Sequence, residues 1–175
     1  ARGVIFPHAG YFYSAKTTGE ALRRVEIPDR SFLIGPNHWG KGADFAVYPE
    51  GEWQTPLGKV RIDINFTSGL LEACHDLRVD EEAHREEHSL EVEIPFLQYR
   101  NPQVQIAPLL VGTLDIEWAR EVAFSLIDYM KTQGNFLMVA STDMSHYEND
   151  AETRKKDRYA LDAISALDEK ALYEA

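Results

Sequence analysis

The sequence has almost no cysteine and no long apolar run, and both shortages limit what the protein can be. Its 175 residues include one cysteine, Cys74, so no internal disulfide can form, which is typical of a reducing cytosol. No stretch of about 18 consecutive apolar residues occurs, so no helix is expected to cross a membrane. No signal peptide is visible. We therefore expect a cytoplasmic protein without a membrane partner.

Positive charge is also scarce. The 18 Lys and Arg are outnumbered by 29 Asp and Glu, which gives a formal net charge of −11. A chain of this charge repels phosphate backbones and anionic surfaces, so nucleic acid is not an expected partner. Common catalytic and nucleotide-binding motifs are missing too: Gly-x-Gly-x-x-Gly, a Walker-type loop, a nucleophile elbow, Cys-x-x-Cys and His-Glu-x-x-His.

What remains is the composition of an ordinary globular domain. Hydrophobic residues make up 44% and charged residues 27% of the chain, which is long enough to bury a substantial core. The chain starts at Ala1 just before a strand pattern and stops at Ala175 inside a helical pattern. We expect residues 1–175 to form a single domain that is truncated at both ends.

Strand and helix patterns alternate along the chain. Apolar runs rich in β-branched and aromatic residues predict strands over 4–6, 31–34, 44–48, 104–110 and 136–140, with a turn or hairpin at 53–60. Helical spacing of apolar residues predicts helices over 14–25, 65–75, 89–100, 116–131 and 151–167. The acidic stretch 81–87 is expected to be a solvated face or loop. This alternation predicts a three-layer α/β fold around a mainly parallel central sheet.

Three of these strands end in a short polar turn that carries a histidine: His8, His38 and His146. The carboxyl ends of parallel strands share one edge of the sheet, where open α/β folds bind ligands. His8 and His38 are separated by about one strand–helix–strand unit, and neighbouring strands are about 4.8 Å apart, so both imidazoles could reach one metal ion. The alternative for each histidine is a turn residue bonded to nearby backbone. Their matching placement favours a metal site.

Two further polar clusters allow more than one interpretation. Asp143 could orient His146, bind metal itself or only cap a turn. Ser89 could cap a helix, while His88 or Glu91 could point into the site. Tyr11 flanks the first histidine turn, as Tyr13 does, and Tyr147 flanks the third; all three could line a pocket or pack at its rim.

Three other residues of metal-binding types receive no role. His75 and His84 follow no strand and lie in acidic stretches expected to be exposed. Cys74 lies on the apolar stripe of a predicted helix, where a free cysteine behaves as a small buried hydrophobe.

Four motifs together resemble the Memo family, whose prokaryotic members are called AmmeMemoRadiSam system protein B. They are Pro7-His8-Ala9-Gly10-Tyr11, Gly35-Pro36-Asn37-His38, Glu87-His88-Ser89-Leu90-Glu91 with Ile94-Pro95-Phe96-Leu97, and Ser141-Thr142-Asp143-Met144-Ser145-His146-Tyr147. They occur in the family's order and span most of the chain.

The resemblance implies a fold similar to the class III extradiol (LigB-type) dioxygenases, which hold non-haem iron(II). By that likeness His8 and His38 match two metal-site histidines, His146 matches a third whose dioxygenase counterpart is the acid–base residue, and Asp143 matches the neighbouring acidic residue. A family cysteine, in place of a dioxygenase glutamate, closes the site near the C-terminus. Cys74 does not match it, so we expect the closing ligand to lie beyond Ala175.

The resulting expectation is a Memo-like protein with a mononuclear metal site and possible metal-dependent redox activity. Iron(II) is the expected ion, and a thiolate ligand would favour copper or zinc. The assigned roles are catalysis by His146 and Asp143, metal binding by His8, His38 and His146, and substrate binding by Tyr11, His88 and Glu91.

The resemblance also implies partners. These are a small molecule or peptide ligand and the radical-SAM and AMMECR-type proteins of the same prokaryotic system. One alternative is a non-catalytic module that binds a peptide or phosphorylated ligand on a dioxygenase-like fold. A zinc hydrolase is a third option.

Overall fold

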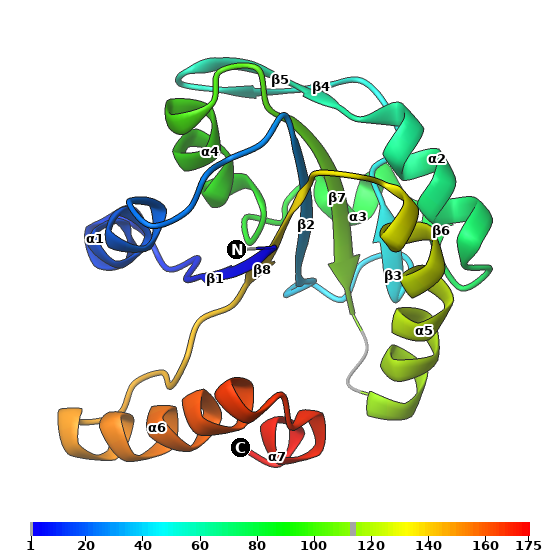
Figure 1. The fold of residues 1–175 in the computed structure, drawn as a ribbon. Helices are drawn as coiled ribbons and strands as arrows, with labels where there is room; N and C mark the ends of the chain where they lie inside the picture. Colours follow the sequence, from blue (N-terminus) through cyan, green and yellow to red (C-terminus); the bar gives the residue numbers. More distant parts are fainter. Residues whose placement is uncertain (1, 113–114) are drawn as a thin grey trace. The chain divides into compact units, whose positions relative to one another are not determined.

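The computed structural model describes residues 2–112 and 115–175 and shows a mixed α/β architecture (Figure 1). The chain divides into two units, residues 1–142 and 143–175. The first unit contains the whole sheet, and the second contains two helices.

The first unit is built on a mostly parallel sheet, as the sequence predicts. Within the described ranges the sheet has eight strands, with the path β1-β8-β2-β7-β3-β6 and the β4–β5 hairpin joined to β7 through β5. The strands are β1 (Gly3–Phe6), β2 (Arg30–Pro36), β3 (Phe45–Val47), β4 (Glu52–Thr55), β5 (Gly58–Ile62), β6 (Arg78–Val79), β7 (Gln105–Val111) and β8 (Leu137–Ser141). Strands β1, β8, β2 and β7 are mutually parallel, whereas β3 runs antiparallel to β7. The carboxyl ends of β1, β8 and β2 therefore lie at one edge.

Helices cover both faces of this sheet (Figure 1). On one face α1 (Tyr11–Leu22) and α4 (Ile94–Arg100) contribute to a core that includes Leu33 of β2. On the other face α2 (Ile64–Ala73) and α5 (Ile116–Thr132) pack with Phe32 of the same strand. Alternate side chains of β2 thus enter different cores, as the pleat of a strand requires. The three-layer prediction is confirmed.

Side-chain caps fix where the two helices of the second face begin. Asp115 accepts hydrogen bonds from the backbone N–H groups of Glu117 and Trp118 at 3.0 and 3.1 Å and is the N-cap of α5. Asp63 caps α2 in the same way, through the N–H of Phe66 at 3.0 Å. Cys74 ends α2 and is buried as predicted, with 2% exposure.

Two stretches differ from the prediction. The segment expected as a solvated loop holds a short helix, α3 (Glu81–His84), in which His84 is buried rather than exposed. The α-helix expected from Ser89 begins only at Ile94, after a 3₁₀ turn, η1 (Glu91–Glu93). Pro95 lies in the first turn of α4, where its missing N–H costs no hydrogen bond, so the proline starts the helix.

The second unit contains α6 (Asp150–Ala166) and α7 (Glu169–Tyr173). Asn149 caps α6 through the backbone N–H of Glu152 at 3.1 Å. Ahead of the helix, the N–H of Ser145 donates to Asp157 Oδ1 at 3.0 Å and ties the preceding turn to α6. Across the described residues of both units, no helix combines the length and apolarity needed to span a membrane.

Candidate metal centre

His8 and His38 meet at the carboxyl edge of the sheet, as the strand-end argument predicts. His8 follows β1 and His38 follows β2, with β8 between the two strands. Their ring centroids are 5.0 Å apart in an edge-to-face arrangement. His8 is buried, with 4% exposure, whereas the side chain of His38 is 42% exposed.

His88 is the third histidine of this cluster, and it comes from the segment between α3 and η1. Its ring stacks on His38 at a centroid distance of 5.0 Å and meets the edge of His8 at 5.7 Å. One ligand atom from each of His8, His38 and His88 lies within 4.8 Å of the others, so the three could hold one metal ion. We call these three residues the His cluster.

The approach of this segment to β2 depends on Gly35. A Cβ added at Gly35 would lie 2.6 Å from Leu90 Cδ2 and 3.0 Å from Ser89 Oγ, distances that real Cβ contacts hardly show. Ser89 Oγ also donates to the carbonyl of Pro36 at 2.8 Å. The glycine removes a steric barrier, and the serine fixes the segment that carries His88 against the strand end.

The hydrogen bonds of His8 identify which of its ring nitrogens can bind metal. Nδ1 lies 2.9 Å from Ser141 Oγ, and that hydroxyl directs its only proton toward two acceptors, the carbonyl of Ser89 at 2.5 Å and Glu93 Oε1 at 3.3 Å. Nδ1 must then be the donor toward Ser141, because the serine has no second proton to give. This tautomer leaves the lone pair on Nε2, as in metal-bound histidines that donate their other N–H to a neighbouring group.

Glu87 organises the other two histidines. Its side chain is 1% exposed, and its carboxylate accepts the backbone N–H groups of His38, His88 and Ser89 at 2.6, 2.8 and 2.8 Å. The same carboxylate lies 3.0 Å from Nδ1 of His38 and 3.3 Å from Nδ1 of His88. A single buried carboxylate therefore fixes two backbone segments and orients the rings that they carry.

These contacts keep Glu87 ionised. Burial alone raises the pKa of a carboxyl group, but hydrogen bonds from His38 Nδ1 and from the N–H groups of Ser89 and His38 outweigh it. The net result is a pKa below the usual value for glutamate. The carboxylate supplies a permanent negative charge beside the His cluster.

Tyr11 and Glu91, predicted as substrate contacts, lie near one another in the first unit. Tyr11 begins α1 and packs edge-on against Phe96, with ring centroids 5.6 Å apart. Burial and the negative charges of Glu91 and Glu93 raise the pKa of its phenol. Their assignment as substrate contacts stays a prediction.

Asp143 and His146 belong to the second unit. His146 Nε2 lies 3.7 Å from Asp143 Oδ2, an ion-pair distance, and the side chains are 60% and 13% exposed. The next residue, Tyr147, has a φ of 57°, a conformation that is uncommon for a residue with a side chain. The roles assigned to Asp143 and His146, including metal binding by His146, stay predictions.

The sequence pattern does not mark Glu87 or Ser141 as site residues, and it predicts His88 as a substrate contact rather than a member of the His cluster. The motif Glu87-His88-Ser89 was visible, but it also fits a helix cap. The contacts of Glu87, His88 and Ser141 with the rest of the site are long-range, so only the tertiary structure reveals them. The available signal was the placement of a glutamate directly before a histidine in a segment predicted to start a helix.

Comparison with known proteins agrees with the motif pattern. A family model described as "Memo-like protein" matches residues 1–175. The chain is 39% identical to a MEMO1 family protein of Methanopyrus kandleri and 40% identical to one of Aquifex aeolicus, in each case over 98% of the chain. It spans 62% and 64% of the length of these relatives. Because the family model covers every residue and the identities hold along nearly the whole chain, this chain belongs to the Memo-like protein family.

Proposed function

We propose that this protein binds one transition-metal ion through His8, His38 and His88. The observation that carries the proposal is the convergence of three ligand atoms within 4.8 Å at the carboxyl edge of the sheet. Metal–nitrogen bonds of about 2.0–2.1 Å place any two ligand nitrogens at most about 4.2 Å apart. Small side-chain rotations are enough to close the His cluster around an ion.

The donor chemistry supports a borderline transition metal. Neutral imidazoles suit iron, copper, zinc and nickel, whereas calcium and magnesium require oxygen ligands. Ser141 favours the tautomer of His8 that carries its ring lone pair on Nε2, and Glu87 accepts from Nδ1 of His38 with the same effect. A bound ion would act as a Lewis acid or, if redox-active, as a one-electron centre.

Within this proposal the surrounding residues position the histidines. Glu87 orients His38 and His88 and balances part of the charge of a cation. Ser141 orients His8 and links it to the segment that carries His88. Because the side chains of His38 and His88 are 42% and 50% exposed, a ligand can approach the cluster from solvent.

The finer assignment follows the likeness to LigB-type dioxygenases. We propose iron(II) as the ion, with copper or zinc as the alternatives, and metal-dependent redox activity in which His146 and Asp143 act as acid–base and orienting groups. The whole protein, which we place in the cytoplasm as AmmeMemoRadiSam system protein B, would work beside radical-SAM and AMMECR-type proteins on a small molecule or peptide.

Metal content of purified variants tests the proposal. We expect about one metal per chain in the parent protein and loss of that metal in His8→Ala, His38→Ala and His88→Ala, with His75→Ala as the control because His75 is exposed. His146→Ala decides between His88 and His146 as the third ligand. Metal content that is unchanged in both His8→Ala and His38→Ala refutes the proposed site.

A second measurement separates the oxygen-activating function from a non-catalytic binding module. Iron(II) is added to the metal-free protein without oxygen, and nitric oxide binding is followed by electron paramagnetic resonance. A signal from nitric oxide bound to ferrous protein supports an open redox site. Iron binding without that signal favours a module that holds a peptide or phosphorylated ligand.

A further inference from the structure

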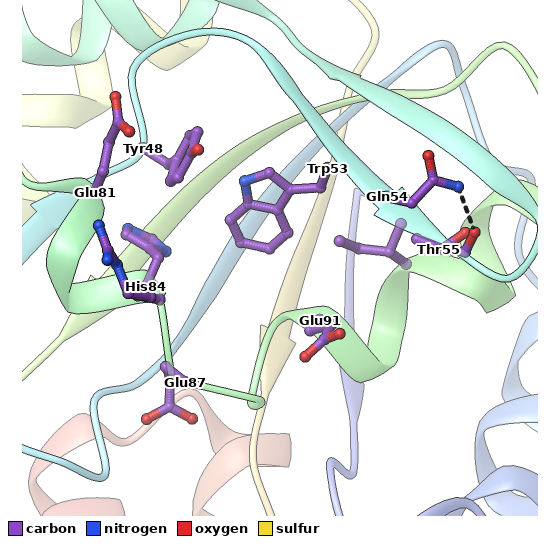
Figure 2. A pocket seen from close by; sticks show the side chains of 10 residues that line it. Tyr48, Trp53, Gln54, Thr55, Glu81, His84, Glu87 and Glu91 are labelled. Carbon is purple, nitrogen blue, oxygen red and sulfur yellow. Dashed lines mark hydrogen bonds between the residues drawn. The ribbon is translucent and has the colours of Figure 1, made fainter.

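A pocket of about 310 Å³ lies next to the His cluster in the first unit and shares Glu87 with it (Figure 2). We call it the His84 pocket and define it by six of its lining residues: Tyr48, Trp53, Glu81, His84, Glu87 and Glu91. Figure 2 shows Trp53 in the middle of the group, with Tyr48 and His84 to one side of it. None of the roles assigned above uses Tyr48, Trp53, Glu81 or His84.

His84, a lining residue of this pocket, carries a buried hydrogen-bond acceptor. Its Nε2 lies 3.0 Å from the carbonyl of Ala46, so Nε2 carries the proton and donates it. The other ring nitrogen, Nδ1, is buried and has no hydrogen-bond partner among the described residues, and the whole residue is only 6% exposed. Burial also lowers the pKa of His84 to about 4, so the ring is neutral near pH 7 and Nδ1 keeps its lone pair. A buried acceptor of this kind requires a donor, and buried polar groups in proteins rarely lack one.

Aromatic rings form one wall. Tyr48 meets Trp53 and His84 edge to face, at centroid distances of 5.3 and 5.5 Å, and Trp53 lies 5.7 Å from His84. Tyr48 and Trp53 are only partly buried, so part of their surface is accessible. Tryptophan and tyrosine faces attract cations through their negative quadrupole.

The charged groups of the pocket are mainly acidic. Glu81 and Glu91 are exposed carboxylates, and the side chain of Glu87 is buried. The cation of the lining, Arg85, pairs with Glu82 at 3.0 Å, which offsets its charge. An anionic ligand would meet the exposed carboxylates of Glu81 and Glu91 near the buried charge of Glu87, whereas a cationic ligand would be attracted by these charges.

We propose that the His84 pocket binds a protonated primary amine. The ammonium N–H groups would donate to Nδ1 of His84, the charge would face Glu81 and Glu91, and the attached carbon group would lie against Trp53 and Tyr48. This site requires no metal, so it can exist whether or not the function proposed for the His cluster is correct, although the two sites share Glu87.

Isothermal titration calorimetry of the metal-free chain at pH 7 tests the proposal with three probes of similar shape: benzylammonium, benzyl alcohol and benzoate. We expect benzylammonium to bind at least about tenfold more tightly than the alcohol, because ion pairing and cation–π attraction act only on the cation. Benzoate is expected not to bind. Equal affinities for the three probes, or a preference for benzoate, overturn the proposal.

Variants locate the binding. Glu81→Gln should weaken benzylammonium binding by about fivefold, since it removes one nearby charge at an exposed position. Glu117→Gln is the matched control, because Glu117 is exposed in the first turn of α5 and its loss changes the net charge equally. His84→Leu removes the ring acceptor and supplies no other, so it should weaken binding further. Equal effects of Glu81→Gln and Glu117→Gln would mean a general charge effect and overturn the assignment to this pocket.

A fourth probe distinguishes a lysine side chain from a small free amine as the source of the ammonium group. N-acetyl-lysine methylamide presents the same ammonium group on the side chain of a peptide. Tighter binding of this probe than of benzylammonium identifies a lysine side chain as the ligand, and weaker binding identifies a small free amine. Failure of both probes to bind refutes the proposal.

Discussion

The pH dependence of folding stability tests whether His84 is buried as a neutral ring. Its pKa falls from 6.5 to about 4, mainly because burial penalises the charged form, and the Ala46 carbonyl and the charges of Asp80 and Glu87 oppose the shift only in part. As pH falls below 6.5, the unfolded chain takes up a proton at this residue and the folded chain does not. The folded state must therefore lose stability as pH falls from 6.5 toward 4.

The size of this loss follows from the two pKa values. A shift of one unit corresponds to about 1.4 kcal/mol, so the full shift of His84 is worth roughly 3 kcal/mol once pH is below both values. Between pH 7 and pH 5, where the protonated fraction changes almost only in the unfolded chain, the contribution is about 2 kcal/mol. His84→Gln removes this term while keeping an amide that can donate to the Ala46 carbonyl.

Urea unfolding of metal-free protein at pH 7 and pH 5, followed by circular dichroism, measures the effect. The loss of unfolding free energy between the two pH values should be smaller in His84→Gln than in the parent by about 2 kcal/mol. His75→Gln is the control, because His75 is exposed and should leave the pH dependence unchanged. If the parent and His84→Gln lose stability equally, His84 is not a buried neutral histidine and the argument fails.

Two further predictions concern the segment that carries His88. Glu87→Gln should weaken metal binding by about 10- to 100-fold, since it removes the charge and the acceptor that orient His38 and His88. Competition with a chelator measures the metal affinity, and an unchanged affinity would contradict the role of Glu87. Gly35→Ala should lower the unfolding free energy by about 1–3 kcal/mol and also reduce metal content, because its Cβ would collide with Leu90 and Ser89. Gly69→Ala is the control for a crowded glycine away from the site, since its Cβ would meet Tyr129, and it should affect stability alone.

Much of the fold could be predicted from the sequence, because hydrophobic periodicity reports directly on strands and helices. The strands that carry His8 and His38, the helix capped by Asp115 and the mainly parallel sheet all follow from local pattern. The two-residue strand β6 could not be predicted, because so short a segment is defined only by its pairing with β3.

The misassigned stretch 81–87 shows where local pattern fails. Its acidic sequence is typical of a solvated loop, but Ala83 and His84 are buried, and the ring of His84 packs against Tyr48 and Trp53. The partners of His84 lie more than 30 residues earlier in the chain, so their approach is a property of the tertiary structure. Burial of a polar residue in an acidic segment cannot be predicted from hydrophobic periodicity, because the segment has no regular pattern of apolar residues.

The metal centre likewise has residues that the sequence predicts and one that it does not. His8 and His38 follow from the rule that parallel strands deliver their carboxyl ends to one edge. His88 cannot be predicted from this rule, because it follows no strand. It reaches the cluster through a segment that Gly35 and Ser89 hold against β2. Sequence motifs identified the residue as a site candidate, but only the geometry groups it with the two strand-end histidines.

Glu87 belongs to both proposed sites, whereas His88 belongs only to the His cluster and Glu81 only to the His84 pocket. Single substitutions can therefore separate the two sites. Its carboxylate orients His38 and His88 and also lines the His84 pocket. His88→Ala should therefore reduce metal binding and leave amine binding intact, whereas Glu81→Gln should do the reverse. Glu87→Gln should weaken both, because one buried charge serves both sites. If Glu87→Gln affected metal binding and left the amine affinity unchanged, the charge that attracts the amine would be that of Glu81 and Glu91 alone.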